Sequence, residues 1–206
     1  MIAIIDYDAG NIKSVEKAFS YLGKETVTTR DEAVILNAEG VVLPGVGAFG
    51  DAMEKLRKYD LVRVIEQVVA KGIPFLGICL GLQLLFEESE ESPGVPGLGL
   101  LSGKIIKIPG GEGLKIPHIG WNSLEYPAKG RLFKGISEED AYVYFVHSYY
   151  LQAAEESIVT ATTRYGALIH ASVEKDNIFA CQFHPEKSSK VGLRILQNFI
   201  AIGEEV

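Results

Sequence analysis

The chain has 206 residues, 47% of them hydrophobic and 23% charged, so it can bury a core and is neither a disordered chain, a coiled coil nor a collagen-like repeat. Its 20 basic and 27 acidic side chains leave a net charge of −7, which argues against binding to nucleic acid through phosphate neutralisation. The longest uncharged run, residues 72–86, is too short for a membrane span, which needs about 20 apolar residues. The acidic start MIAIIDYD differs from a signal peptide, and two cysteines are too few for a disulfide framework, so we expect a cytoplasmic protein.

The first half of the chain alternates short apolar runs with helical patterns. Strands are expected at residues 2–5, 26–29, 40–43 and 75–78, and helices at residues 12–22, 61–69 and 81–86. In the second of these helices, apolar residues recur at i, i+3, i+4, i+7 and i+8, which is the spacing of a helix with one buried face. This alternation of strand and helix predicts a mostly parallel sheet covered by helices on both faces.

The second half of the chain is dominated by β-type runs. They lie at residues 104–108, 121–126, 142–149, 158–163, 168–173 and 179–183, and an amphipathic helix follows at residues 191–200. Some of these strands are expected to pair antiparallel and to extend or flank the parallel sheet. Neither side of the loop at residues 92–97 is long enough to be a domain alone. We therefore expect one α/β domain spanning residues 1–206.

A cysteine stands between two glycines where a buried strand passes into a helix, in the run Gly77-Ile78-Cys79-Leu80-Gly81. This pattern is typical of a nucleophile elbow, in which a sharp turn needs neighbours without a Cβ and exposes the central side chain. The amino terminus of the following helix favours the thiolate form of that side chain. Isolated cysteines in apolar strands are more often structural. We interpret Cys181 in that way and Cys79 as a candidate nucleophile.

A nucleophile needs a base, and the chain offers one histidine with a carboxylate two positions later. Of the four histidines, only His184 has this neighbour, in Phe183-His184-Pro185-Glu186. In an extended segment residues i and i+2 project to the same side, so Glu186 can orient the ring of His184. Cys79, His184 and Glu186 are therefore a candidate triad. The scattered histidines match no usual zinc spacing, so no metal site is expected.

The run at residues 45–50 matches G-x-G-x-x-G and follows a predicted strand. It sits on the third strand with Pro44 before it, and no acidic residue ends the following strand to bind a ribose, which argues against a dinucleotide loop. The backbone N–H groups of this glycine-rich loop are better suited to an oxyanion hole, which stabilises the charge that develops when a thiolate attacks a carbonyl.

The Pro44-Gly45-Val46-Gly47 motif, the cysteine elbow and His184-Pro185-Glu186 occur in the order and spacing of the class I glutamine amidotransferases, and the whole chain resembles one such domain. Four further stretches resemble, more closely, the glutaminase subunits of imidazole glycerol phosphate synthases. These stretches are residues 6–11, 115–122, 145–150 and 183–189. Asp8 departs from the pattern, since many relatives are expected to have glycine there.

The resemblance implies hydrolysis of glutamine with release of ammonia. Cys79 is then the nucleophile that attacks the side-chain amide carbon, and His184, oriented by Glu186, protonates the departing ammonia and later activates water. The backbone N–H groups of Gly47 and Leu80 are the expected oxyanion hole. The residues expected to contact glutamine are Gln83, Glu91, His147, Ser148 and Tyr149.

Three of these glutamine contacts also have an ordinary structural interpretation. Gln83 is placed to cap the helix after the elbow, and Glu91 belongs to an acidic run that is typical of a solvated face. His147 alternates with apolar residues, as a hydrogen-bonded core histidine would. The sequence leaves both interpretations open.

The resemblance also implies a partner, because no segment of the chain is left over for a second active site. The expected partner is a (β/α)8-barrel cyclase of histidine biosynthesis, which joins the ammonia to a phosphoribosyl-formimino aminoimidazole carboxamide ribonucleotide and yields imidazole glycerol phosphate and aminoimidazole carboxamide ribonucleotide. No cofactor is expected. The residues expected to face the barrel are Asn11, Trp121, Tyr144 and Lys187, although Tyr144 also suits ordinary strand packing.

The resemblance further implies a glutaminase that is nearly silent until the cyclase binds its own substrate, and Gly45 and Gly47 permit a peptide flip in the oxyanion loop as a means of control. Three alternatives remain: a glutaminase of the same class for pyridoxal phosphate, anthranilate or purine synthesis, a cysteine peptidase or esterase, and a non-catalytic interaction module. The stretches at residues 115–122 and 187–189 argue against the first, and the intact triad argues against the last.

Overall fold

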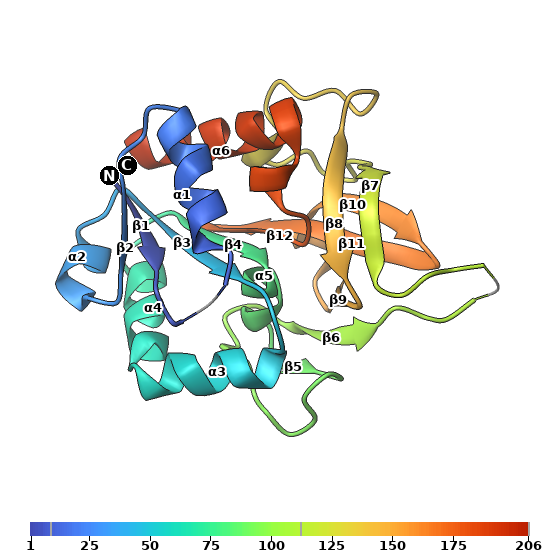
Figure 1. Cartoon of the computed structure of the whole chain (residues 1–206), viewed down its shortest axis with the longest axis horizontal. Helices are drawn as coiled ribbons and strands as arrows, with labels where there is room; N and C mark the ends of the chain where they lie inside the picture. Colours follow the sequence, from blue (N-terminus) through green and yellow to red (C-terminus); the bar gives the residue numbers. More distant parts are fainter. Residues whose placement is uncertain (9, 112, 206) are drawn as a thin grey trace.

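The computed structural model describes residues 1–8, 10–111 and 113–205, so Ala9 of the predicted turn at residues 6–11 lies outside the described part. A ten-stranded sheet runs through the described residues (Figure 1). Its first five strands, in spatial order, are β2 (Thr26–Thr29), β1 (Ile2–Ile5), β3 (Gly40–Gly45), β4 (Phe75–Cys79) and β12 (Ile178–Cys181). All neighbours in this half are parallel, as the strand and helix pattern predicted.

The other half of the sheet is antiparallel for most of its width. From β12 it continues through β11 (Ala167–Lys175), β9 (Tyr149–Ala153) and β6 (Gly103–Lys107), with the short β5 (Glu88–Ser89) at the edge and β10 (Val159–Tyr165) paired with β11. A separate two-stranded antiparallel sheet is formed by β7 (His118–Ser123) and β8 (Tyr142–His147). The expected antiparallel extension of a parallel sheet is therefore confirmed.

Helices cover the parallel half on both faces (Figure 1). In chain order they are α1 (Ile12–Tyr21), α2 (Glu32–Leu36), α3 (Phe49–Lys58), α4 (Leu61–Ala70), α5 (Leu80–Leu84) and α6 (Ser189–Glu204), with single 3-10 turns at Arg131–Phe133, Glu156–Ile158 and Pro185–Lys187. Because side chains alternate along a strand, β1 feeds two cores. Ala3 and Ile5 pack with α3 and α4, whereas Ile2 and Ile4 pack with α1 and α6.

Three expectations about the elements were wrong in detail. The helices α2 and α3 were missed, although Phe49, Ala52, Met53 and Leu56 in α3 form a buried stripe at helical spacing. The run at residues 142–149 is two strands, because the chain leaves β8 at Ser148 and enters the main sheet as β9. The strand expected at residues 121–126 lies earlier, as β7, because its register is set by pairing with β8.

The sheet brings the predicted functional segments to one edge. β3, β4 and β12 are parallel neighbours, with Gly45 opposite Cys79 and Cys181 opposite Ile78. Their carboxyl ends therefore meet at the same edge, which is where open α/β sheets bind ligands. None of the helices in the described part of the chain is both long and apolar enough to cross a membrane.

Candidate active site

Cys79 occupies a strained turn between β4 and α5. Its φ of 55° and ψ of −107° fall in a region that residues with a Cβ rarely adopt. The turn closes because its flanking positions are glycines: a Cβ on Gly77 would lie 2.7 Å from the carbonyl oxygen of Gly81, and one on Gly81 would overlap the carbonyl of Leu43. The predicted elbow is therefore present.

His184 and Glu186 follow β12 at the same edge of the sheet. Nδ1 of His184 lies 2.8 Å from Oε1 of Glu186, and the carboxylate has no exposed surface. Since the carboxylate accepts a hydrogen bond from the Nδ1–H group, Nε2 is the nitrogen that faces other partners. Burial by itself lowers the pKa of His184, but hydrogen bonds to Cys79 and Glu186 and the charges of both raise that pKa to about 9. The imidazolium form is thus favoured at neutral pH.

The loop after β3 lies against the elbow. A Cβ on Gly45 would meet the hydroxyl of Tyr7 and would lie 2.9 Å from the Cβ of Leu80, so glycine is required for this close approach. Gly47 has a φ of 102°, which also favours glycine. The buried hydroxyl of Tyr7 donates to the carbonyl of Pro44 at 2.8 Å and fixes the start of the loop.

The start of α3 is already occupied by side chains. The amide of Phe49 donates to Oε2 of Glu91 at 2.8 Å, and the amide of Gly50 donates to Oγ of Ser92 at 3.0 Å. A dinucleotide loop would offer these helix-terminal amides to a pyrophosphate. The protein uses them internally, in agreement with the rejection of a dinucleotide site.

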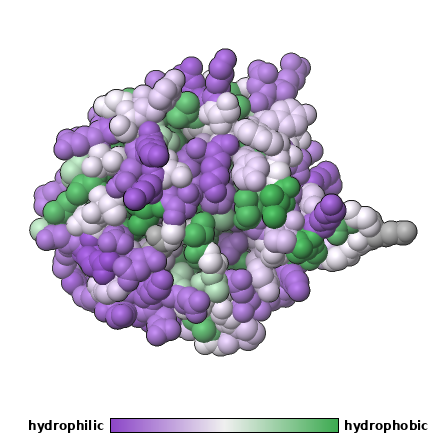
Figure 2. Space-filling model, in the orientation of Figure 1, coloured by the Kyte–Doolittle hydropathy of each residue, from purple (hydrophilic) through white to green (hydrophobic). Residues whose placement is uncertain are grey.

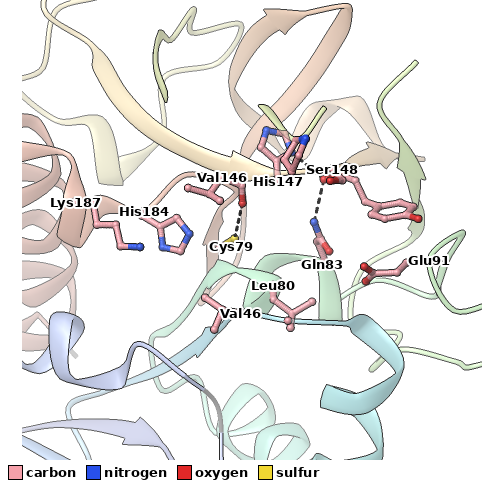
Figure 3. A pocket seen from close by; sticks show the side chains of 13 residues that line it. Val46, Cys79, Leu80, Gln83, Glu91, Val146, His147, Ser148, His184 and Lys187 are labelled. Carbon is pink, nitrogen blue, oxygen red and sulfur yellow. Dashed lines mark hydrogen bonds between the residues drawn. The ribbon is translucent and has the colours of Figure 1, made fainter. Parts of the chain in front are cut away.

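A cavity of about 250 Å³ opens beside Cys79. Apart from Glu186, which lies behind His184, all the predicted catalytic, oxyanion and glutamine-contacting residues line it. Figure 3 shows the sulfur of Cys79 between His184 and Lys187 on one side and Gln83 and Glu91 on the other. No group of three histidine, cysteine, aspartate or glutamate residues that could hold a metal ion occurs within residues 1–8, 10–111 and 113–205.

Comparison with known proteins agrees with this geometry. The family model described as class-I glutamine amidotransferase matches residues 3–202. The chain belongs to this family. A subunit named HisH of imidazole glycerol phosphate synthase, from Moorella thermoacetica, is 52% identical over 198 residues, covering 96% of this chain and 93% of the relative. The corresponding subunit of Aquifex aeolicus is 51% identical over 197 residues, covering 95% and 94%.

Solved structures show the amidotransferase fold as well. A crystal structure described as a glutamine amidotransferase matches with a TM-score of 0.77 and 20% identity, covering 99% of this chain and 100% of the other. A glutaminase domain of a Trypanosoma brucei protein called CTPS, with bound acivicin, matches with a TM-score of 0.71 and 17% identity, covering 99% and 93%. The predicted α/β fold class is confirmed.

In this amidotransferase, two buried histidines hold the strand that borders the cavity. Nδ1 of His147 donates to the carbonyl of Tyr149 at 2.9 Å, and its Nε2 lies 3.0 Å from Nδ1 of His118. His118 is stacked between the rings of Phe145 and Tyr165. Burial lowers the pKa of His147 to about 3 and that of His118 to about 4, so both rings are neutral. The side chain of His147 therefore has the hydrogen-bond partners of a core histidine, while the residue also lines the cavity.

Gln83 and Glu91 reach the cavity while also making internal hydrogen bonds. Nε2 of Gln83 donates to the carbonyl of Tyr149 at 3.0 Å, which ties α5 to the strand β9. Glu91 uses one carboxylate oxygen to cap α3, as described for Phe49. Neither residue is merely a solvated surface group.

Two contacts of the site were missed by the sequence analysis. Asn11 was expected at an interface, yet its Nδ2 donates to Oε1 of Glu186 at 2.7 Å, so the carboxylate has a second donor besides His184. Gln182 contacts Cys79 through Nε2, 3.7 Å from the sulfur. The available signal was a polar residue inside the apolar run Phe179-Ala-Cys-Gln-Phe183, which has no reason to be buried unless it is hydrogen-bonded.

Two of the other predicted interface residues, Trp121 and Tyr144, lie on β7 and β8 at an exposed apolar patch, whereas Lys187 lines the cavity. Trp121 is 53% exposed and packs edge-on against Tyr144, with ring centroids 6.0 Å apart. Ile119 and Tyr142 on the same two strands are 60% and 53% exposed. Figure 2 shows hydrophobic side chains interrupting the polar surface on the face in view. Such a patch is typical of a protein-binding surface.

Proposed function

We propose that this chain is the glutaminase subunit of an imidazole glycerol phosphate synthase, which hydrolyses glutamine and supplies the ammonia to a cyclase subunit. The observation that carries the chemistry is a cysteine on a strained elbow beside a buried histidine and glutamate pair. The choice of pathway is supported by about half of the residues being identical, along nearly the whole chain, to subunits of that synthase from several organisms.

The first half of the reaction makes a thioester. The thiolate of Cys79 attacks the side-chain amide carbon of glutamine, and the carbonyl oxygen becomes an oxyanion that accepts hydrogen bonds from the backbone N–H groups of Gly47 and Leu80. The imidazolium of His184 then gives its Nε2 proton to the amide nitrogen, the C–N bond breaks and ammonia leaves. The raised pKa of His184, about 9, supports this role because the proton is in place before the attack.

The second half restores the enzyme. His184 has given up its proton and can now accept one from water, which attacks the thioester carbonyl and releases glutamate. Glu186 keeps the Nδ1 proton in place through both halves, so Nε2 is always the reacting nitrogen. The hydrogen bond from Asn11 to the same carboxylate oxygen restrains Glu186 in this position.

The cavity supports one orientation of glutamine. With the amide at Cys79, the amino-acid end extends toward Gln83 and Glu91, on the side away from His184 (Figure 3). The second oxygen of Glu91 suits an ammonium group, and the backbone of residues 148 and 149 suits a carboxylate. Ammonia then forms on the other side of the sulfur, near His184 and Lys187.

The proposal includes a (β/α)8-barrel cyclase as the partner. The exposed patch on β7 and β8, with Trp121 and Tyr144, is the proposed contact surface, together with Asn11 and Lys187 next to the triad. In this complex the ammonia would join a phosphoribosyl-formimino aminoimidazole carboxamide ribonucleotide. A cytoplasmic location is part of the proposal, supported by two free cysteines, one of them the proposed nucleophile.

Glutamate release from glutamine tests the proposal, measured for this chain alone and with the cyclase and its nucleotide ligand. We expect a weak signal alone, a strong rise with both additions, and none from a Cys79→Ser variant that folds normally. Release that ignores the cyclase would keep the glutaminase but reject the pathway. No release under any condition would reject the glutaminase itself.

A further inference from the structure

A buried glutamine, Gln182, connects the sulfur of Cys79 with the wall of the glutamine cavity, and the reaction steps above do not use it. It follows β12, lies two residues before His184 and has no exposed surface. Its Nε2 lies 3.7 Å from Sγ of Cys79, and its Oε1 accepts a hydrogen bond of 3.0 Å from Nε2 of Gln83. Burying an amide without partners is costly, so both ends of this side chain depend on these contacts.

Three hydrogen bonds connect Tyr149 through Gln83 and Gln182 to Cys79, and the carbonyl of Tyr149 sets the direction of all three. The carbonyl oxygen of Tyr149 can only accept, so Gln83 must turn its NH2 group toward it. The same NH2 group also donates to Gln182, which therefore presents its oxygen to Gln83 and its own NH2 group to the sulfur. A backbone carbonyl thus determines that the nucleophile meets a donor and not an acceptor.

The sulfur needs that donor only when it is ionised. As a thiol, Cys79 can donate to the carbonyl oxygen of Val146, 3.8 Å away. As a thiolate it has no proton to donate, and it faces the negative end of this carbonyl dipole. The N–H group of Gln182 then becomes a stronger, charge-assisted hydrogen-bond donor to the sulfur. The N–H group of Gln182 therefore holds the ionised sulfur in place beside His184.

We propose that Gln182 is a positioning residue for the glutaminase reaction, which holds the Cys79 thiolate through Nε2 and fixes the amide of Gln83 through Oε1. This role rests on the proposed function of Cys79 as the nucleophile. One side chain then fixes the position of the Cys79 sulfur relative to Gln83, which lines the glutamine cavity. Its two ends make separate predictions, because they contact different parts of the site.

Two substitutions separate the two ends. Gln182→Glu keeps an oxygen for Gln83 and replaces the N–H donor by an acceptor, whereas Gln182→Met removes both hydrogen bonds at similar length. Ser172→Ala is the matched control, because Ser172 is fully buried on the neighbouring strand and donates to the carbonyl of Ala180 at 2.8 Å. The control loses this hydrogen bond and the one that Ser172 accepts from Thr160 at 3.2 Å, without removing a hydrogen bond to Cys79.

The experiment measures the rate at which iodoacetamide alkylates Cys79 in the full chain as a function of pH, together with kcat and KM for glutamine in the complex with the cyclase. We expect Gln182→Met to raise the midpoint of the alkylation profile by about one pH unit and to lower kcat about tenfold. Gln182→Glu should raise the midpoint further and leave KM nearly unchanged, whereas KM should rise in Gln182→Met. Ser172→Ala should match the wild type in all three quantities.

Profiles of the Gln182 variants that coincide with that of Ser172→Ala would overturn the role of Gln182. If Gln182→Glu does not fold, the alkylation profile, kcat and KM of Gln182→Met alone test the role of Gln182. Wild-type chain that keeps its glutaminase activity after complete alkylation of Cys79 would instead overturn the proposed nucleophile, and the role of Gln182 with it. The two failures are therefore distinguishable.

Discussion

Acid is expected to weaken the folded state through the buried imidazole of His147. Burial lowers the pKa of this ring from its ordinary 6.5 to about 3, against a backbone hydrogen bond to Tyr149 that raises it. Below 6.5 the unfolded chain therefore binds a proton that the folded chain refuses. The stability that depends on neutral His147 is fully present above this pH and is lost as the pH falls toward 3.

The size of this effect follows from the shift. Each pH unit below the ordinary pKa of 6.5 corresponds to about 1.4 kcal/mol. At about pH 5, keeping the ring of His147 neutral therefore lowers the free energy of unfolding by about 2 kcal/mol. A His147→Gln variant can still donate to Tyr149 and accept from His118, but it does not titrate. We therefore compare the wild type with this variant and attribute only the difference to His147.

The assay is urea unfolding of both proteins at about pH 7.5 and at about pH 5. Between these conditions the wild type should lose about 2 kcal/mol more than His147→Gln, since all other titrating groups are common to both. Equal losses would mean that His147 is protonated in the folded chain as easily as in the unfolded one, and that its burial does not destabilise the fold in acid.

Three further substitutions test the site. Gly47→Ala should lower glutamate release in the complex at least tenfold and lower the melting temperature by a few degrees, because the new Cβ meets no atom within 4 Å but a φ of 102° is strained for a residue with a Cβ. Full activity with full stimulation by the cyclase would remove support for a flipping loop. In Asn11→Gly, glycine adopts the φ of 70° without strain and the hydrogen bond to Glu186 is lost, so kcat should fall about tenfold. An unchanged kcat would mean that Asn11 does not hold Glu186. Trp121→Ala should weaken cyclase binding about tenfold or more in titration calorimetry and spare glutamate release by the chain alone; unchanged binding would place the interface elsewhere.

The parts of the site that were predicted from sequence are those fixed by local backbone geometry. Gly77 and Gly81 are needed because the elbow brings the chain into contact with itself, and this need is visible in five consecutive residues. His184 and Glu186 are two residues apart, and their contact is present, although the chain forms a 3-10 turn at Pro185–Lys187 where the prediction assumed an extended segment. The order of strands then brought the two local motifs together.

The missed contacts depend on tertiary structure. Asn11 and Glu186 are 175 positions apart, and Gln182 and Cys79 are 103 positions apart. Nothing in the local pattern around Asn11 distinguishes a residue that faces a partner from one that holds a carboxylate. Only the packing of α1 beside the turn after β12 decides between them.

The misplaced elements have similar causes. The run at residues 142–149 alternates without interruption, yet the chain changes sheets at Ser148 because β8 pairs with β7 and β9 pairs with β6. Pairing partners far along the sequence set that break. The helix α3 differs, because its apolar stripe begins within the glycine-rich motif at residues 45–50 and has helical spacing that is visible in the sequence alone.

Trapping the intermediate shows whether Cys79 forms a glutamyl thioester. The complex with the cyclase and its nucleotide ligand is incubated with glutamine, quenched in acid, digested and analysed by mass spectrometry. We expect a glutamyl adduct on the peptide that contains Cys79, and none on the peptide with Cys181 or in a Cys79→Ser variant. Steady glutamate production by a variant that lacks Cys79 would mean that the reaction does not pass through this thioester.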